Sequence, residues 1–102
     1  MADYIYLVQL DIPNELEERF NHLYDTEHVP NLLTVPGVHG CTRYRLDSAD
    51  VDGAARYAAI YEIDTPETTT SAAWREQSNK GEWITEIRPH LTTRIHIIYK
   101  RI

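Results

Sequence analysis

The sequence is short of cysteine and of long apolar runs, and each shortage excludes a class of protein. Cys41 is the only cysteine among the 102 residues, so no disulfide can form within the chain and a reducing compartment suits it. No apolar run approaches the ~20 residues that a membrane-spanning helix needs. The first residues also lack the basic region and apolar core of a signal peptide. We therefore expect a cytoplasmic protein that has no membrane partner.

Basic charge is also scarce. Lysine and arginine number 10 against 16 acidic residues, which gives a net charge of −6. Binding to a phosphate backbone needs a concentrated basic surface, and this chain offers only the small clusters Arg43/Arg45 and Lys100/Arg101. We expect no nucleic-acid partner.

The spacings typical of metal and phosphate sites are missing as well. The five histidines form no His-x-x-x-His pair and no ligand set with a carboxylate: His22, His28, His39, His90 and His96. There is no glycine-rich phosphate loop and no nucleophile elbow. Cys41 lies inside an expected strand and is interpreted as a buried, inert thiol. The sequence thus predicts neither a metal nor a cofactor.

What is present is a regular succession of strand and helix patterns in a single domain, residues 1–102. Alternating or continuously apolar runs predict strands over 4–10, 37–46, 56–63 and 91–99. Helical spacing predicts a helix from the N-cap Asn14, with Glu17 completing a capping box, to about His28, continued as a displaced turn through Leu33. A second helical region starts at Thr65-Pro66, is firmest over 72–77, stops at 79–81 and resumes over 83–87. The order βαββαβ predicts a ferredoxin-like α+β fold.

The predicted strands carry apolar residues on both faces. Helices can cover only one face of such a sheet, and the chain has no further element for the other. We therefore expect a homodimer in which a second copy covers the second face.

One stretch, residues 20–37, combines titratable side chains with firm helix-ending signals. Tyr24 and His28 are four residues apart, so in a helix their side chains can meet on one face. Histidine exchanges protons near neutral pH, and a tyrosine hydroxyl can orient it or polarise a substrate carbonyl. The alternative is structural: His28 binds the terminal carbonyls of the helix while Tyr24 packs in the core.

These residues also carry a family resemblance. The pattern Tyr24-x-x-x-His28-x-Pro30, followed by Val35-Pro36-Gly37-Val38, resembles the EthD-like branch of the dimeric α/β-barrel superfamily. The tail, residues 87–91 with Arg94, Tyr99 and Ile102, is similar to an uncharacterised bacterial subgroup of it. The resemblance implies a homodimer whose two sheets form a closed barrel, with a pocket between sheet and helices in each subunit. It also implies small, aromatic or polyketide-like substrates and dehydration, cyclisation, isomerisation or cofactor-free oxygenation.

Several further side chains are candidates for substrate binding in such a pocket, each with a structural alternative. Arg88 and His90 could hold a carboxylate or phenolate, or could form a structural corner at the start of the last strand. Asn31 could orient a ligand or cap the turn after Pro30. The aromatic candidates could line a cavity or belong to core and dimer interface: Tyr6, Tyr44, Tyr57, Tyr61, Trp74 and Trp83.

The first functional hypothesis is a small, cofactor-independent enzyme that acts on an aromatic or polyketide-like molecule by general acid/base chemistry, with His28 and Tyr24 as catalytic residues. A non-catalytic small-molecule-binding or stress-response dimer is the alternative. A cofactor-free monooxygenase would use the same pocket.

Overall fold

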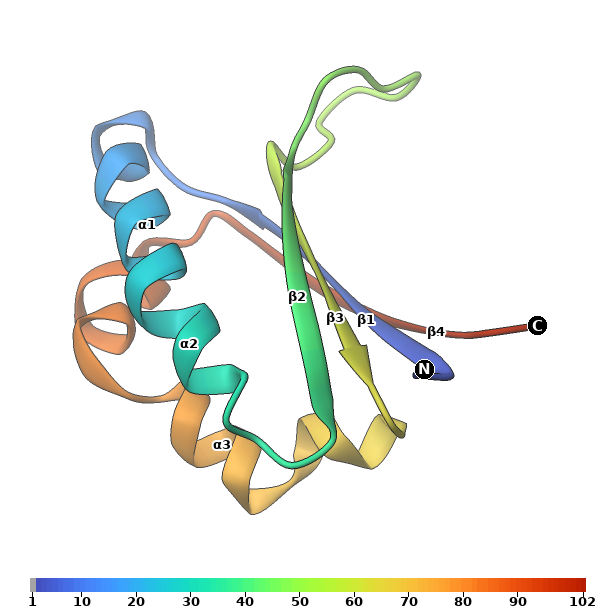
Figure 1. The fold of residues 1–102 in the computed structure, drawn as a ribbon. Coiled ribbons are helices and arrows are strands. Elements are labelled where there is room, and N and C mark those ends of the chain that lie inside the picture. The colour runs from blue at the N-terminus through green and yellow to red at the C-terminus, as the bar shows by residue number, and fades with distance from the viewer. Residues whose placement is uncertain (1) are drawn as a thin grey trace.

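The computed structural model describes residues 2–102, which form one four-stranded antiparallel sheet with all helices on one face (Figure 1). The strands are β1 (Tyr4–Asp11), β2 (Val38–Arg45), β3 (Tyr57–Ile63) and β4 (Thr93–Lys100). Their order across the sheet is β2-β3-β1-β4, so β2 and β4 are the edges. The predicted ferredoxin-like α+β fold is confirmed.

The helical regions are broken into short pieces. The first region runs through a 3-10 turn (Asn14–Leu16), α1 (Glu17–Leu23), a π turn (Tyr24–His28) and α2 (Val29–Leu32). The second region runs through a 3-10 turn (Pro66–Thr70), α3 (Ala72–Ser78), a second π turn (Trp83–Ile87) and a last 3-10 turn (Arg88–His90). None of the helices within residues 2–102 has the length and apolar composition needed to cross a bilayer.

The predicted capping box at the start of the first helix is wrong. Neither Asn14 nor Glu17 closes onto the helix backbone; both side chains instead accept hydrogen bonds from Arg56, at 2.9 and 3.1 Å. Arg56 also donates to Asp11 at 2.9 Å and to the carbonyl oxygen of Ile12. A guanidinium with several aligned donors satisfies these oxygens better than one backbone amide, so Arg56 ties the start of β3 to the end of β1 and the helix start.

The expected alternation of β2 fails at its first residues. The register of β2 against β3 shifts between Val38 and Gly40, as it does where a strand contains a bulge. Val38 and Cys41 consequently both pack against the helix-facing core, although strict alternation places them on opposite faces. From Cys41 onward the alternation follows the prediction.

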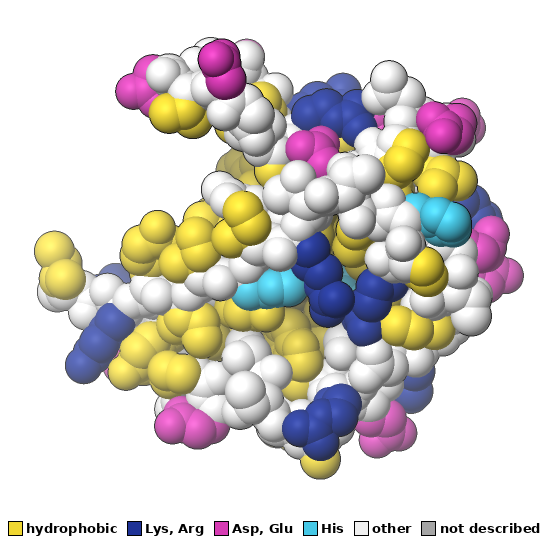
Figure 2. All heavy atoms as spheres, turned by 180° about the vertical axis from the view of Figure 1, so that it is seen from behind, with side chains coloured by type: hydrophobic (Ala, Val, Ile, Leu, Met, Phe, Trp, Pro, Cys, Tyr) yellow, Lys and Arg dark blue, Asp and Glu magenta, His cyan; other side chains and the backbone are white. Residues whose placement is uncertain are grey.

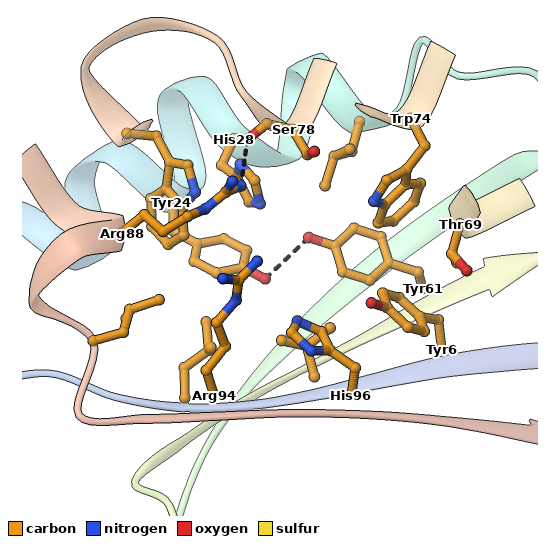
Figure 3. A pocket seen from close by; sticks show the side chains of 15 residues that line it. Tyr6, Tyr24, His28, Tyr61, Thr69, Trp74, Ser78, Arg88, Arg94 and His96 are labelled. Carbon is orange, nitrogen blue, oxygen red and sulfur yellow. Dashed lines mark hydrogen bonds between the residues drawn. The ribbon is translucent and has the colours of Figure 1, made fainter. Parts of the chain in front are cut away.

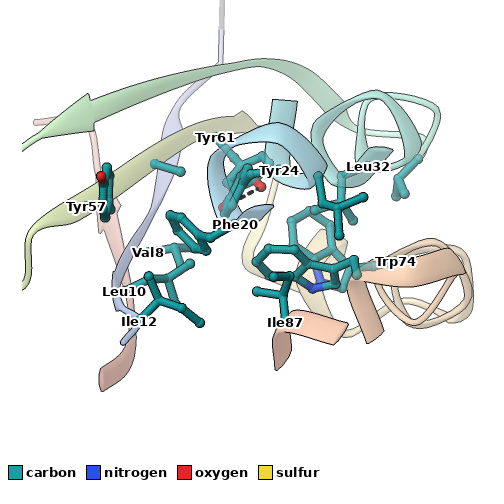
Figure 4. Close-up of a cluster of buried hydrophobic side chains, with 14 of the residues drawn as sticks. Val8, Leu10, Ile12, Phe20, Tyr24, Leu32, Tyr57, Tyr61, Trp74 and Ile87 are labelled. Atoms are coloured by element: carbon teal, nitrogen blue, oxygen red, sulfur yellow. Dashed lines mark hydrogen bonds between the residues drawn. The ribbon is translucent and has the colours of Figure 1, made fainter. Parts of the chain in front are cut away.

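The core between sheet and helices is built around aromatic rings (Figure 4). Phe20 has no exposed surface, and its ring lies 5.0 Å from that of Tyr57, 5.7 Å from that of Tyr24 and 6.0 Å from that of Trp83. Tilted and edge-on contacts of this kind add to the free energy gained by burying the rings. The helices and the sheet are therefore held at fixed positions on either side of this cluster.

The opposite face of the sheet carries large apolar side chains with no covering element within residues 2–102. Tyr44, Ile95 and Tyr99 point away from the helices and are exposed to 52%, 45% and 52%. The β2–β3 loop extends beyond the ends of these two strands (Figure 1). Val51 within the loop is 65% exposed. A contiguous apolar surface of this kind usually marks an interface.

We predict that Arg56→Ala lowers the free energy of unfolding by about 1–3 kcal/mol, because several buried or half-buried oxygens lose a charged donor. Arg75→Ala is the control, because Arg75 is exposed on α3 and should change stability by less than about 0.5 kcal/mol. Urea unfolding of both variants measures the difference. Equal free energies of unfolding for the two variants would show that the Arg56 contacts make no net contribution to stability.

We also predict a homodimer through the open sheet face. Light scattering after size exclusion should give twice the chain mass of 11.9 kDa at micromolar concentration. Ile95→Lys should shift the protein to monomer, since a charge would be buried in the interface. Ile98→Lys is the matched control on the same strand: Ile98 is also partly exposed, at 37%, but is paired with Tyr6 on the helix-facing side. A wild-type monomer, or equal dissociation of both variants, would contradict this interface.

Candidate active site between the sheet and the helices

A cavity of about 280 Å³ lies between the sheet and the helices, towards the β4 edge (Figure 3). An apolar cavity of roughly 150 Å³ holds a benzene ring, so this one has room for an aromatic molecule of one or two rings. Seen from behind, blue and cyan basic side chains gather around a hollow in this region (Figure 2). The lining residues are Tyr6, Val8, Leu10, Tyr24, His28, Leu32, Tyr61, Thr69, Trp74, Ser78, Trp83, Arg88, Leu91, Arg94 and His96.

The first π turn brings Tyr24 and His28 into this cavity. The backbone N–H of Val29 donates to the carbonyl oxygen of Tyr24, five residues earlier, so the turn is one residue wider than an α-helical turn. The helix then continues through Pro30, which the sequence predicted to end its regular part near His28. The rings of Tyr24 and His28 are edge-on with centroids 5.1 Å apart, so the predicted contact between them is present.

The second π turn supplies the wall opposite His28. Its first residue, Trp83, stacks on the imidazole with ring centroids 4.3 Å apart and planes inclined by 22°. The carboxylate of Glu27 accepts a hydrogen bond from the backbone N–H of Trp83 at 2.8 Å, which fixes the two π turns to each other. The indole Nε1 of Trp83 is buried and has no hydrogen-bond partner among the described residues.

His28 is neutral in this environment. The residue is 8% exposed, and the pKa of the imidazole falls from 6.5 to about 3, chiefly because the ring is buried. The positive charges of Arg88 and Arg94 make a smaller contribution to this lowering. At neutral pH the ring therefore has an unprotonated nitrogen that can accept a proton or a hydrogen bond.

Tyr24 and Tyr61 form a phenol pair in the wall. Their hydroxyl oxygens are 3.0 Å apart, so one hydroxyl donates to the other. Burial raises the pKa of both phenols, and the hydrogen bond to Tyr61 offsets only part of the rise for Tyr24. Both remain protonated at neutral pH, so one O–H of the pair is left to donate to a ligand.

Arg88 and Arg94 make the cavity cationic. Arg88 is held by the side-chain oxygen of Asn79 and the carbonyl oxygen of Ser78, both at 2.5 Å and both uncharged. The ion pairs within residues 2–102 include neither Arg88 nor Arg94, and no acidic residue lines the cavity. Burial and the charge of Arg94 lower the pKa of Arg88.

Seven of the eleven candidates named from the sequence line the cavity together: Tyr6, Tyr24, His28, Tyr61, Trp74, Trp83 and Arg88. The other four lie elsewhere, and of these Tyr57 packs against Phe20 in the core. Tyr44 points to the open face because it pairs with Ala58, whose neighbours Tyr57 and Ala59 face the helices. The carbonyl oxygen of Asn31 accepts from Thr34 in the turn that ends α2. His90 is exposed in the last 3-10 turn.

Four polar residues of the wall were not among the candidates: Thr69, Ser78, Arg94 and His96. Tyr6 and His96 stack with centroids 5.5 Å apart, and Tyr6 meets Trp74 edge-on at 5.4 Å. The signal was present in the alternation of β4, which places Arg94 and His96 on one face of the strand. Polar residues on the helix-facing side of an edge strand indicate an opening there.

Neither a metal site nor a reactive thiol is found in the part of the chain that the structure describes. Within residues 2–102 no three His, Cys, Asp or Glu side chains are grouped to hold a metal ion. Burial raises the pKa of Cys41 to about 11, so its thiol is protonated at neutral pH.

The lowered pKa of His28 predicts a pH-dependent stability. In the unfolded chain His28 binds a proton below about pH 6.5, whereas in the folded chain it does so only near pH 3. The folded state is therefore not penalised by His28 above pH 6.5, and its free energy of unfolding decreases as the pH falls below that value. Between pH 6.5 and about pH 5, the free energy of unfolding of wild type should fall by on the order of 2 kcal/mol more than that of His28→Gln. Urea titrations of both proteins at the two pH values measure this; parallel losses would contradict a buried neutral imidazole.

Solved structures with this fold come from several bacteria. A proposed antibiotic biosynthesis monooxygenase from Bordetella bronchiseptica superposes with a TM-score of 0.72 at 14% identity, with 99% of each chain covered. An EthD-family protein from Bacillus halodurans gives 0.66 at 14% identity, with 97% of this chain and 99% of that chain covered. A dimeric ferredoxin-like protein of unknown function from Thermobifida fusca gives 0.60 at 11% identity, covering 95% of this chain and 89% of that one.

At these identities the likeness concerns the fold, and it agrees with the EthD-like resemblance seen in the sequence. Among curated proteins, none matches this sequence. The sequence profile of one family, described as a domain of unknown function, DUF4286, matches residues 3–101, nearly the whole chain. The chain therefore belongs to the DUF4286 family.

Proposed function

We propose that the protein is a cofactor-independent enzyme that acts on an aromatic or polyketide-like small molecule by general acid/base chemistry. The observation that carries this proposal is the neutral, buried imidazole of His28 in a cavity wall, beside a phenol pair and facing two arginines. A structural histidine at a helix end would need neither the cavity nor the arginines.

In this proposal His28 removes a proton from a carbon next to a substrate carbonyl. The proton moves to the imidazole nitrogen, and the electron pair of the C–H bond moves onto the carbonyl oxygen as an enolate. A phenol of the Tyr24–Tyr61 pair would donate a hydrogen bond to that oxygen, which is supported by both phenols being protonated in the cavity wall. Donors fixed before the reaction stabilise such charge without reorganisation.

The stacking of Trp83 on His28 supports the role of the imidazole as base. It covers one face of the ring and restricts its orientation. A base held in one position contributes more than a mobile one, because the reacting atoms meet without further loss of entropy.

A second candidate, cofactor-free oxygenation, begins with the same proton removal. The resulting carbanion would then transfer an electron to O₂, and the two radicals would recombine to form the C–O bond of a peroxide. The description of the Bordetella bronchiseptica neighbour as a proposed monooxygenase favours this candidate. Oxygen consumption during turnover separates it from a simple isomerisation or cyclisation.

Proton exchange tests the acid/base role without knowledge of the natural reaction. In D₂O, wild type should accelerate deuterium uptake next to the carbonyl of 2-tetralone, a bicyclic aromatic ketone, as followed by NMR. His28→Gln should reduce the enzymatic rate about 10²–10⁴-fold, and Tyr24→Phe should reduce it less.

The melting temperature of both variants serves as the control, because lost folding would also lower the rate. A His28→Gln protein that exchanges at the wild-type rate, or a wild type that binds 2-tetralone without accelerating exchange, would favour the non-catalytic binding protein.

A further inference from the structure

The cavity has an excess of hydrogen-bond donors and positive charge over acceptors. Arg88 and Arg94 carry two full charges, and the ion pairs within residues 2–102 leave both without a carboxylate. Figure 3 shows the two guanidinium groups reaching into the cavity from opposite sides, Arg88 from the helical layer and Arg94 from β4. Like charges that face one cavity repel, so an anion bound between them would be stabilised by both.

A separate observation points to the same kind of ligand. The indole of Trp83 is 2% exposed, and its N–H has no partner among the described residues although it belongs to the cavity wall. Leaving a buried donor unsatisfied costs about 1–3 kcal/mol, so an acceptor that enters the cavity and reaches this N–H would recover that free energy.

We infer that the cavity binds an aromatic carboxylate, with Arg94 and Arg88 at the carboxylate and the indole N–H of Trp83 donating to a further acceptor of the ligand. This inference rests on the proposed function, whose substrate class it narrows. Carboxylate suits the two guanidinium groups because its two oxygens match the paired N–H donors of arginine. The rings of Tyr6, Tyr61 and Trp74 offer an apolar wall for the aromatic part.

The position of Arg94 agrees with such a role. Arg94 lies on the helix-facing side of edge strand β4, opposite Leu10, and its side chain is exposed at the opening. An anion arriving from solvent meets Arg94 before it reaches Arg88, which is half-buried and anchored to Asn79. Burial is the main reason why His28 is neutral, and the charges of Arg88 and Arg94 add to it. A bound carboxylate would offset these two charges and so make the imidazole a stronger base while substrate is present.

Calorimetric titration of the full-length protein with 2-naphthoate and with 2-naphthamide tests the inference. The two probes have nearly the same shape and differ in charge. Wild type should bind the acid at least about tenfold more tightly than the amide at pH 7.5, as loss of a charged hydrogen bond predicts.

Arg94→Gln should weaken 2-naphthoate about 10–100-fold and change the affinity for 2-naphthamide less than about threefold. Arg75→Gln on the exposed side of α3 is the matched control and should leave both affinities unchanged. Trp83→Phe should weaken 6-hydroxy-2-naphthoate, whose hydroxyl oxygen is a further acceptor, more than 2-naphthoate, which has no acceptor besides its carboxylate. Arg94→Lys keeps the positive charge and controls for a folding defect in Arg94→Gln. Its affinity for 2-naphthoate should lie between those of wild type and Arg94→Gln.

Equal affinity for acid and amide, no binding of the acid, or equal losses in Arg94→Gln and Arg75→Gln would overturn the inference. The measurement involves no turnover, so its failure is distinct from that of the acid/base role. If the acid binds through Arg94 while His28→Gln exchanges protons normally, the anion site stands and the proposed catalysis fails.

Discussion

The site depends on how the helical chain passes two prolines. A proline inside a helix lacks the N–H for the carbonyl four residues earlier, and its ring collides with that carbonyl. Here each π turn ends two residues before a proline, at His28 before Pro30 and at Ile87 before Pro89. The extra residue widens the turn and lets the chain continue in helical form instead of stopping.

The wide turns also decide how the two helical regions meet. Tyr24 and His28 keep the four-residue spacing that places side chains on one face of an α-helix, and their rings are in contact within the wide turn. The two π turns face each other, so the first residue of one stacks on the last residue of the other.

Much of the fold was readable from the sequence because it depends on periodicity. Strand alternation gave the four strands and both sheet faces, and helical spacing placed Tyr24 beside His28. The predictions that were wrong concern residues that had more than one possible hydrogen-bonding or pairing partner. Asn14 and Glu17 have the residue types of a capping box, but a distant arginine offered more donors. The bulge after Val38 depends on how β2 meets β3, which no local pattern encodes.

The cavity could be predicted only in part, for a related reason. Its aromatic members are also ordinary core residues, and only the three-dimensional structure shows which of them leave a space between them. Arg94 and His96 were visible as a polar pair on one face of a strand, but their significance depends on that face being turned towards the helices. The indole N–H of Trp83 is buried and has no hydrogen-bond partner among the described residues, and only the folded structure can show this.

The aromatic composition of the wall has an optical consequence. The chain contains two tryptophans, Trp74 and Trp83, and both belong to the cavity. Excitation selective for indole therefore reports on this one region, with no background from the rest of the molecule. The wavelength of the emission maximum and the near-ultraviolet circular dichroism can therefore follow ligand entry, solvent entry or local loosening of the wall without a label. Changes at the open face of the sheet, which has no tryptophan among its described residues, would not give these signals.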